Sequence, residues 1–282
     1  MIDRLEIQRR ASSLGVVPDV IDHDYALGCV LHALAQHPAV RQHWVFKGGT
    51  SLAKCYFSVF RFSEDLDFTV TSKLSIHHFR EILEVIRKLV QQTTGLRTNV
   101  RALSVDSNKD AFGMEGLEGR LYYQGIWVFR GDPRAVRIHV NSDEAILFEP
   151  KDRPLNHPYS DAGAISSQSI LTYSLEETIL EKLRALSGQR RYAIARDLFD
   201  LHVLNKQSFD KDKTLRLFPA KCEAKGLRVD NLDLSAILER REKYALNWRT
   251  NLEYLIPSEL RVEFSEAWNT AVGLVKEAIN SR

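Results

Sequence analysis

The order of hydrophobic and polar positions divides the chain into a mixed first half and a helical second half. Apolar residues spaced three and four positions apart predict helices over residues 22–36 and 74–94, the second ending at Gly95. Strict alternation predicts a strand at residues 65–70. Later elements of this half are predicted as strands at 99–103, 120–129 and 136–140, a polar loop at 106–118 and a turn at 131–133.

The second half of the chain shows only the helical spacing. Residues 150–170 contain three prolines and a serine-rich run, a composition typical of a linker. Ser174 and Glu177 then match a capping box at the start of a helix that continues through Leu186. Further helices are predicted at 193–205, 208–225, 233–246 and 258–279. We therefore expect a domain at 1–150, a linker at 151–170 and a helical domain at 171–282.

Composition limits the class of protein. The 282 residues are 44% hydrophobic and 27% charged, which is typical of a soluble globular protein. No run of about eighteen apolar residues is present and the charged N-terminus lacks the apolar core of a signal peptide, so we expect no membrane span and a cytoplasmic location. The three cysteines have no zinc-site spacing. A net charge of +2 neither favours nor excludes nucleic acid.

Candidate chemistry concentrates in the stretch FKGGTSLAKCYFSVFRFSEDLDFTV, residues 46–70. Gly48 and Gly49 allow positive φ and a close approach of the backbone to a ligand, and Thr50 is suited to begin the helix that follows. As a strand, residues 65–70 would place Asp65 and Asp67 on one face, with Cα atoms roughly 7 Å apart. Two carboxylates beside a turn able to bind phosphates form a plausible site for Mg²⁺ and a nucleotide.

Each half of this motif is weak by itself, because any half-solvated strand can carry two acids and any glycine pair can be a turn. Their order, strand, Gly-Gly turn, helix and acidic strand, is more specific. It resembles the nucleotidyltransferase core of the DNA polymerase β type, and KGGTSL followed by RFSEDLDF resembles the AbiEii/AbiGii toxin family, which includes the mycobacterial MenT toxins. The resemblance implies a mixed α/β sheet domain with flanking helices, followed by an all-helical C-terminal domain.

The same resemblance gives some role to Arg61 and Ser63, which precede the acidic strand. Arg61 would face a phosphate and Ser63 would lie beside the metal; otherwise both are loop residues that satisfy backbone groups. Polymerase-β-type enzymes usually carry a third carboxylate on a later strand. His139 stands at that place here, and a neutral imidazole is a poor partner for Mg²⁺. This departure leaves either one metal held mainly by Asp65 and Asp67 or a substitute role for His139.

A second polar cluster lies in the helical half. Lys182 falls at the edge of an apolar helix stripe, where it can simply extend to solvent or can neutralise a triphosphate. Asp197 and Asp200 share a helix face near apolar positions, which a structural ion-pair network would explain. The segments EKL-R-AL and ARDLFDL resemble the second AbiEii-family motif, so the resemblance implies a role for Lys182 and Asp197 in catalysis or nucleotide binding. Asp200 is assigned to nucleotide binding or structural support.

These residues suggest a complete reaction. A nucleoside triphosphate would bind as its Mg²⁺ complex at Asp65 and Asp67, with its phosphates at residues 48–50 and Lys182. An acid, Asp67 or Asp197, would help to remove the proton of the attacking hydroxyl. The family resemblance further implies transfer of a nucleotide to the 3′ end of tRNA by the toxin of a toxin–antitoxin system linked to phage defence, with a cognate antitoxin.

Two other functions fit the same residues. One is a nucleotidyltransferase that modifies a protein or a small molecule such as an antibiotic, since the fold does not determine the acceptor. The other is a non-catalytic nucleotide- or RNA-binding protein, which the missing third acid makes plausible.

Overall fold

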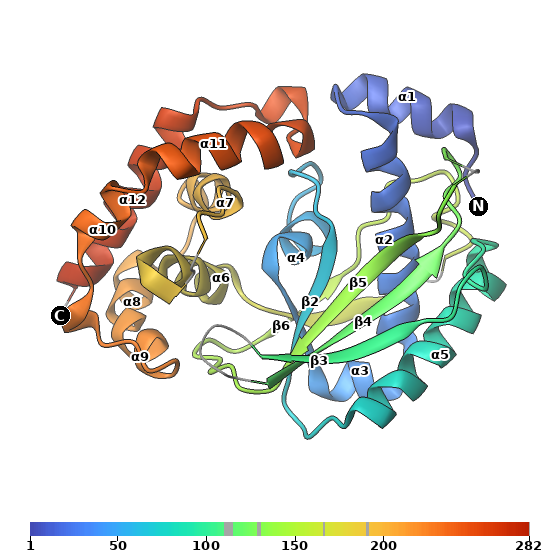
Figure 1. Cartoon of the computed structure of the whole chain (residues 1–282), viewed down its shortest axis with the longest axis horizontal. Helices are drawn as coiled ribbons and strands as arrows, with labels where there is room; N and C mark the ends of the chain where they lie inside the picture. The colour runs from blue at the N-terminus through green and yellow to red at the C-terminus, as the bar shows by residue number, and fades with distance from the viewer. Residues whose placement is uncertain (110–114, 129–130, 166, 190–191, 282) are drawn as a thin grey trace.

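A mixed seven-stranded sheet carries the acidic strand near its middle, in the order β3-β4-β5-β2-β1-β7-β6 (Figure 1). The computed structural model describes residues 1–109, 115–128, 131–165, 167–189 and 192–281. Strand β2 is antiparallel to β1 and parallel to β5. The strands are β1 (Trp44–Lys47), β2 (Asp65–Val70), β3 (Ser104–Lys109), β4 (Glu115–Tyr123), β5 (Arg134–Asn141), β6 (Lys151–Pro154) and β7 (Ser169–Thr172). This mixed sheet with flanking helices confirms the predicted fold class.

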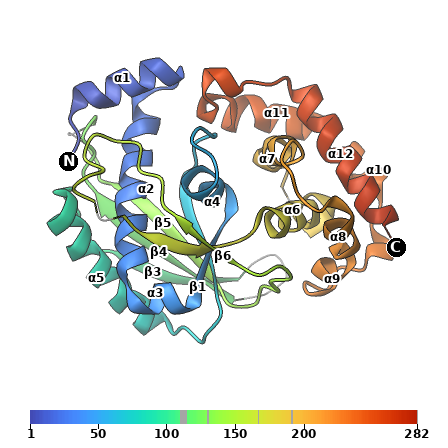
Figure 2. The ribbon, with the colours of Figure 1, turned by 180° about the vertical axis from the view of Figure 1, so that it is seen from behind.

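Two long helices cover one face of this sheet, α2 (Pro18–Gln36) and α5 (Ile76–Thr94) (Figures 1 and 2). The predicted apolar stripe of α5 is buried, and the helix ends at Gly95 with φ +74°, as expected for a C-terminal glycine. Helix α2 begins four residues before Asp22 because Pro18 occupies its first turn, where a missing N–H costs nothing. The other face of β3, β4 and β5 has no helix over it in the described part of the chain (Figure 1).

The glycine pair lies at the junction of β1 with α4 (Gly48–Cys55), and α4 leads back to β2. The helix begins at Gly48 with Lys47 as its N-cap, so the prediction that Thr50 begins the helix is wrong. Thr50 lies inside the first turn and is 2% exposed, and its hydroxyl donates to the backbone of β2 instead of capping α4. Shorter helices α1 (Arg4–Leu14) and α3 (Pro38–His43) complete this half.

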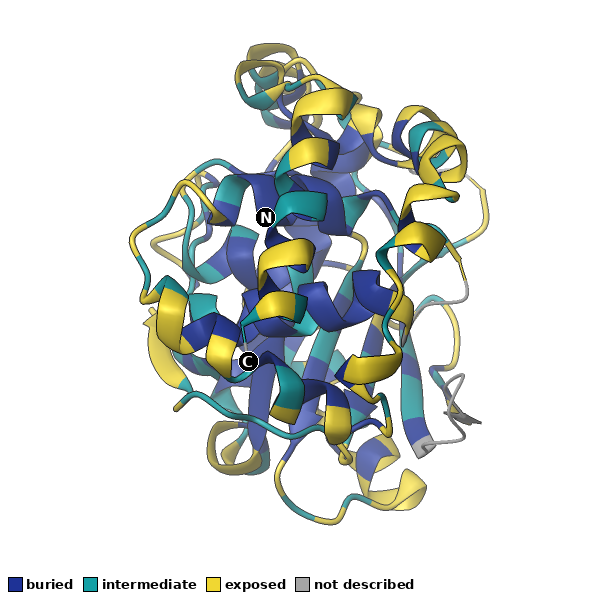
Figure 3. Ribbon diagram, turned by 90° about the vertical axis from the view of Figure 1, so that its left-hand side faces the viewer, coloured by how far each residue is buried: buried dark blue, intermediate teal, exposed yellow. Residues whose placement is uncertain are grey.

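The second half is helical and has its own buried core, which includes Leu183, Leu201 and Trp248. Exposed residues lie mainly on the sides of its helices that face away from this core (Figure 3). Its helices are α6 (Leu175–Arg184), α7 (Arg196–Leu204), α8 (Lys211–Arg216), α9 (Phe218–Glu223), α10 (Leu234–Leu238), α11 (Arg241–Asn251) and α12 (Phe264–Asn280). Leu52 of α4 and Phe60 join this core, so the chain just before the acidic strand packs against the helical half.

Several predicted elements differ from the structure. The strand predicted at 99–103 is wrong: β3 starts at Ser104 inside the predicted loop, of which residues 110–114 lie outside the described residues. The sequence of β3 does not show the alternation of apolar and polar residues typical of a strand, because β3 is an edge strand with mostly polar residues. The strand predicted at 120–129 ends at Tyr123, and the last predicted residue, 129, lies outside the described residues. The helices predicted at 208–225 and 233–246 are each divided into two shorter helices.

The segment predicted as a linker contributes to the sheet. It contains β6 and the start of β7, which pairs in parallel with β1 at the centre of the sheet. Only Tyr173 and Ser174 separate β7 from α6, and Ser174 accepts the Glu177 N–H as the predicted N-cap. The division of the chain into domains stays a prediction. No helix in the described part of the chain is long and apolar enough to cross a membrane.

Candidate active site

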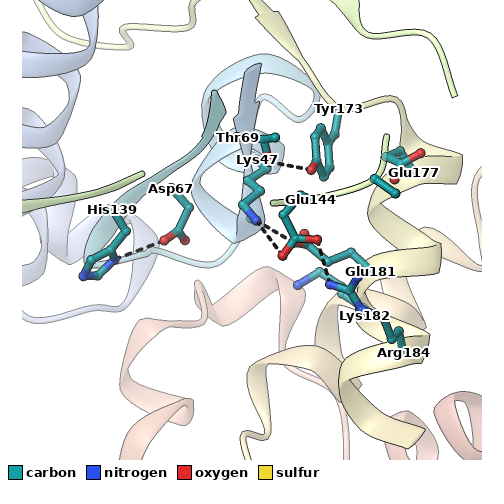
Figure 4. Close-up of polar contacts among 12 residues, drawn as sticks. Lys47, Asp67, Thr69, His139, Glu144, Tyr173, Glu177, Glu181, Lys182 and Arg184 are labelled. Atoms are coloured by element: carbon teal, nitrogen blue, oxygen red, sulfur yellow. Dashed lines mark hydrogen bonds and ion pairs between the residues drawn. The ribbon is translucent and has the colours of Figure 1, made fainter. Parts of the chain in front are cut away.

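The carboxylates of Asp65 and Asp67, called the acid pair below, lie on one face of β2 beside β5. In the parallel register, Asp65 faces Arg137 and Asp67 faces His139. The nearest Arg137 nitrogen is 3.7 Å from Asp65 Oδ1, whereas His139 Nδ1 donates to Asp67 Oδ1 over 3.1 Å (Figure 4). The alternation of residues 65–70 therefore has the predicted consequence: both acids are on the polar face and Leu66 and Phe68 are buried.

The two acids differ in their electrostatics. Burial, together with the charge of Asp67, raises the pKa of Asp65, whose Oδ1 has no hydrogen-bond partner. Burial by itself would also raise the pKa of Asp67. The hydrogen bond from His139 and the charges of His139 and Lys47 outweigh this effect, so the pKa of Asp67 is lowered. The hydrogen bond to Asp67 raises the pKa of His139. Asp67 is thus ionised and held in place, while Asp65 has an unsatisfied oxygen.

The glycine pair packs directly on this strand. Gly48 has φ +80°, and a Cβ there would lie 2.8 Å from Asp67 Oδ2. A Cβ at Gly49 would lie 2.0 Å from an Arg61 guanidinium nitrogen, so only glycine fits. The Thr50 hydroxyl donates to the Asp65 carbonyl oxygen over 2.5 Å, which joins the turn to the strand. Since that proton is used within the protein, a phosphate would depend on backbone N–H groups here.

The other predicted residues form a buried charge cluster, which we define as Arg61, Lys182, Asp197 and Asp200. Arg61 donates to both oxygens of Asp200 over 2.6 Å, and Lys182 Nζ lies 2.5 Å from Asp200 and 3.2 Å from Asp197. All four residues are less than 7% exposed. Ser63, also buried, accepts a long hydrogen bond of 3.4 Å from Arg61. The two motif blocks of the sequence therefore meet through Asp200.

This pairing corresponds to the ion-pair network that the sequence offered as the structural alternative. Burial opposes ionisation of Asp200, but the charges of Arg61 and Lys182 outweigh it and lower its pKa. Arg61 faces a carboxylate rather than open space, and the guanidinium supports the backbone at Gly49. The roles of Lys182 and Asp197 in nucleotide binding stay predictions.

Sequence reasoning missed a neighbouring group around Lys47. Lys47 is in register with Asp67, and its Nζ lies 2.9 Å from Glu181 and 3.7 Å from Glu144 (Figure 4). Arg184 bonds to the same Glu144 over 3.1 Å. Burial opposes the charge of Lys47, but the two carboxylates raise its pKa above the usual value. Lys47 thus connects β1 to α6 next to Lys182; only its place before the glycine pair could have indicated a role.

The acid pair has the chemistry that Mg²⁺ prefers. Asp65 Oδ1 is buried without a hydrogen-bond partner, and Asp67 Oδ2 faces the glycine turn. Both are hard carboxylate oxygens, and Mg²⁺ is commonly bound by one or two carboxylates together with substrate phosphates and water. No cluster of three or more acidic, histidine or cysteine ligands occurs among the described residues. The pair therefore fits a cation whose other ligands come from the nucleotide and solvent.

Comparison with known proteins relates this arrangement to a family. The family model described as "Nucleotidyl transferase AbiEii toxin, Type IV TA system" matches residues 30–272. Among solved structures, MenT4, a nucleotidyltransferase toxin from Mycobacterium tuberculosis H37Rv, is 21% identical with a TM-score of 0.56, covering 97% of this chain and 99% of its own. JHP933 from Helicobacter pylori is 18% identical with a TM-score of 0.58, covering 94% of both chains. A search of curated proteins gives no match.

Proposed function

This chain belongs to the AbiEii nucleotidyl transferase toxin family of type IV toxin–antitoxin systems, and from that membership we propose that it transfers a nucleoside monophosphate from an NTP to the 3′ end of tRNA. The family implies a nucleotidyltransferase that uses an NTP and has a cognate antitoxin. The observation that carries the proposal is the acid pair packed against the glycine turn, with one carboxylate oxygen that has no hydrogen bond and another that faces the turn.

Asp65 and Asp67 would hold Mg²⁺, which when bound neutralises charge on the triphosphate. The N–H groups at the start of α4 would hold the phosphates, since a helix N-terminus favours anions. The acceptor hydroxyl oxygen then forms a bond to the α-phosphorus while the bond from that phosphorus to the bridging oxygen breaks. The electron pair leaves with pyrophosphate, and Asp67 or Asp197 takes the hydroxyl proton.

An RNA acceptor is supported by the open face of the sheet next to the acid pair. Arg137 of β5 and Arg120 of β4 are in register with Asp65, and their side chains are 54% and 43% exposed. Tyr122 lies two residues further along β4 on the same face, with the Arg101 guanidinium 4.7 Å from its ring centre. Guanidinium groups bind phosphates and an aromatic ring can stack on a base, which together suit a single-stranded RNA end.

The test is incubation of the purified protein with each radiolabelled NTP, Mg²⁺ and one acceptor at a time: total tRNA, a protein extract or an aminoglycoside. We expect label only in tRNA, with a corresponding gain in tRNA mass, and none with Asp65→Ala. Label in protein or aminoglycoside instead would establish a different acceptor. NTP binding without turnover, together with growth inhibition that survives Asp65→Ala, would establish the non-catalytic alternative.

A further inference from the structure

Three polar side chains form one row across neighbouring strands of the open sheet face. Asp67 of β2 is in register with His139 of β5, and His139 is in register with Glu118 of β4. His139 Nδ1 is 3.1 Å from Asp67 Oδ1, and its other nitrogen, Nε2, is 3.4 Å from Glu118 Oε2. The imidazole therefore lies between two carboxylates, one on each side of β5.

This row determines which oxygen of Asp67 is available. Oδ1 is occupied by the imidazole N–H, so the carboxylate cannot rotate without losing that hydrogen bond. Oδ2 is the oxygen that faces Gly48, where an added Cβ would lie 2.8 Å away. The bond to His139 thus directs the second oxygen toward the turn at which the triphosphate is expected.

Glu118 in turn fixes the imidazole. Arg120 donates to Glu118 over 2.6 Å from the same strand, which holds this carboxylate beside the ring. The side chain of Glu118 is only 17% exposed, so water competes weakly for it. With each ring nitrogen facing a carboxylate oxygen, the ring has a single orientation in which both contacts form.

We propose that His139 and Glu118 are positioning residues for the metal site. His139, which stands where the third carboxylate is usually found, orients Asp67, and Glu118 orients His139. The proposal rests on the function proposed above. His139 does not bind the cation itself: Nδ1 already donates to Asp67, and imidazole suits Mg²⁺ poorly. Instead it acts as outer-shell partners of ligating groups do, by holding a ligand in its binding orientation.

The experiment measures binding of Mn²⁺, a paramagnetic substitute for Mg²⁺, by electron paramagnetic resonance with an α,β-methylene NTP analogue that cannot react. We expect His139→Leu to weaken Mn²⁺ binding about 10- to 100-fold, the usual effect of losing an outer-shell partner. His139→Asn is the matched control, because its amide nitrogen can occupy the position of Nδ1, and it should restore most of the affinity. Glu118→Gln should give an intermediate loss.

Thermal unfolding of each variant separates positioning from folding. A His139→Leu protein that unfolds at the wild-type temperature but binds Mn²⁺ weakly supports the proposal. Unchanged Mn²⁺ affinity in that variant overturns it and leaves the proposed function intact. Nitrogen coupling from His139 to bound Mn²⁺ also overturns it, because the imidazole would then be a ligand. A wild-type protein that binds no Mn²⁺ with the analogue overturns both this proposal and the metal site of the proposed function.

Discussion

The acid pair and the buried charge cluster each contain two aspartates, but the protein satisfies the carboxylates of the two regions to different extents. Asp67 has a 39% exposed side chain, and Asp65 has an oxygen without a hydrogen bond. Asp200, in contrast, is fully buried and bonds to Arg61 with both oxygens. The pKa of Asp65 is raised by burial, whereas the pKa of Asp200 is lowered by its cationic partners.

This difference separates Asp65, which keeps one oxygen free of hydrogen bonds, from Asp200, whose two oxygens are both bonded within the fold. A buried carboxylate oxygen without a hydrogen bond costs free energy in the absence of a ligand, so Asp65 Oδ1, whose nearest cation is Arg137 at 3.7 Å, is a candidate ligand-binding atom. The ion pair between Arg61 and Asp200, which are 139 residues apart in the chain, joins the two halves of the molecule. Both carboxylate oxygens are bonded, so this pair needs no ligand to account for it. A candidate residue is therefore better judged by its unsatisfied atoms than by its motif.

The largest expected effect concerns the acid pair. Asp65→Asn and Asp67→Asn should each reduce nucleotide transfer at least about 1,000-fold, because the amide removes the charge that would bind the metal–triphosphate complex. The free energy of unfolding should change by less than about 1 kcal/mol. Transfer rates and urea unfolding measure the two quantities. Glu64→Gln, an exposed neighbour, is the control and should retain activity; large destabilisation by either aspartate variant would contradict the comparison.

The opposite result is expected for the buried charge cluster. Arg61→Met leaves Asp200 buried without its bidentate partner, which should cost about 3–5 kcal/mol of unfolding free energy. The double variant Arg61→Met/Asp200→Leu should recover part of that loss, because it leaves fewer unpaired charges. Urea unfolding of both proteins provides the measurement. If Arg61→Met had wild-type stability but failed to bind NTP, Arg61 would belong with the ligand-binding groups.

The smallest expected effect is on the pH dependence of stability: Asp65 and Asp200 should change the free energy of unfolding in opposite directions as the pH falls. Because the folded pKa of Asp65 is raised above its ordinary 3.8, the ionised carboxylate costs stability, and acidification through that raised pKa relieves the cost. The folded pKa of Asp200 is lowered, so its contribution is fully present above 3.8 and is lost only as the pH falls below that value.

Comparison of unfolding free energies with the Asn variants tests these signs. As the pH falls from 7 to 4, the wild type should gain stability relative to Asp65→Asn and keep its advantage over Asp200→Asn. Below pH 3.8 that advantage should decrease. Parallel pH curves for the two variants would remove the electrostatic distinction between the two regions.

Local patterns in the sequence were sufficient for much of this structure. Alternation placed Asp65 and Asp67 on one face, and Ser174 and Gly95 marked a helix start and a helix end correctly. Edge strand β3 gave no such signal, because its sequence, SVDSNK, is mostly polar and does not alternate.

Contacts between distant residues were the other limit. Lys47 pairs with Glu181 across 134 residues of chain, and no local period reports such a contact. The sequence shows that His139 stands where a carboxylate is expected, but its contacts depend on strand register, which places it between Asp67 and Glu118.

The short connection between β7 and α6 has a mechanical consequence. Tyr173 donates its N–H to Phe46 of β1, and its ring hydroxyl shares a hydrogen bond with Thr69 of β2 (Figure 4). Helix α6 follows the sheet directly, because only two residues, both hydrogen-bonded, separate it from β7. A displacement of the central strands would therefore also displace α6 and Lys182 near its C-terminal end, so this connection couples the position of Lys182 to that of the sheet.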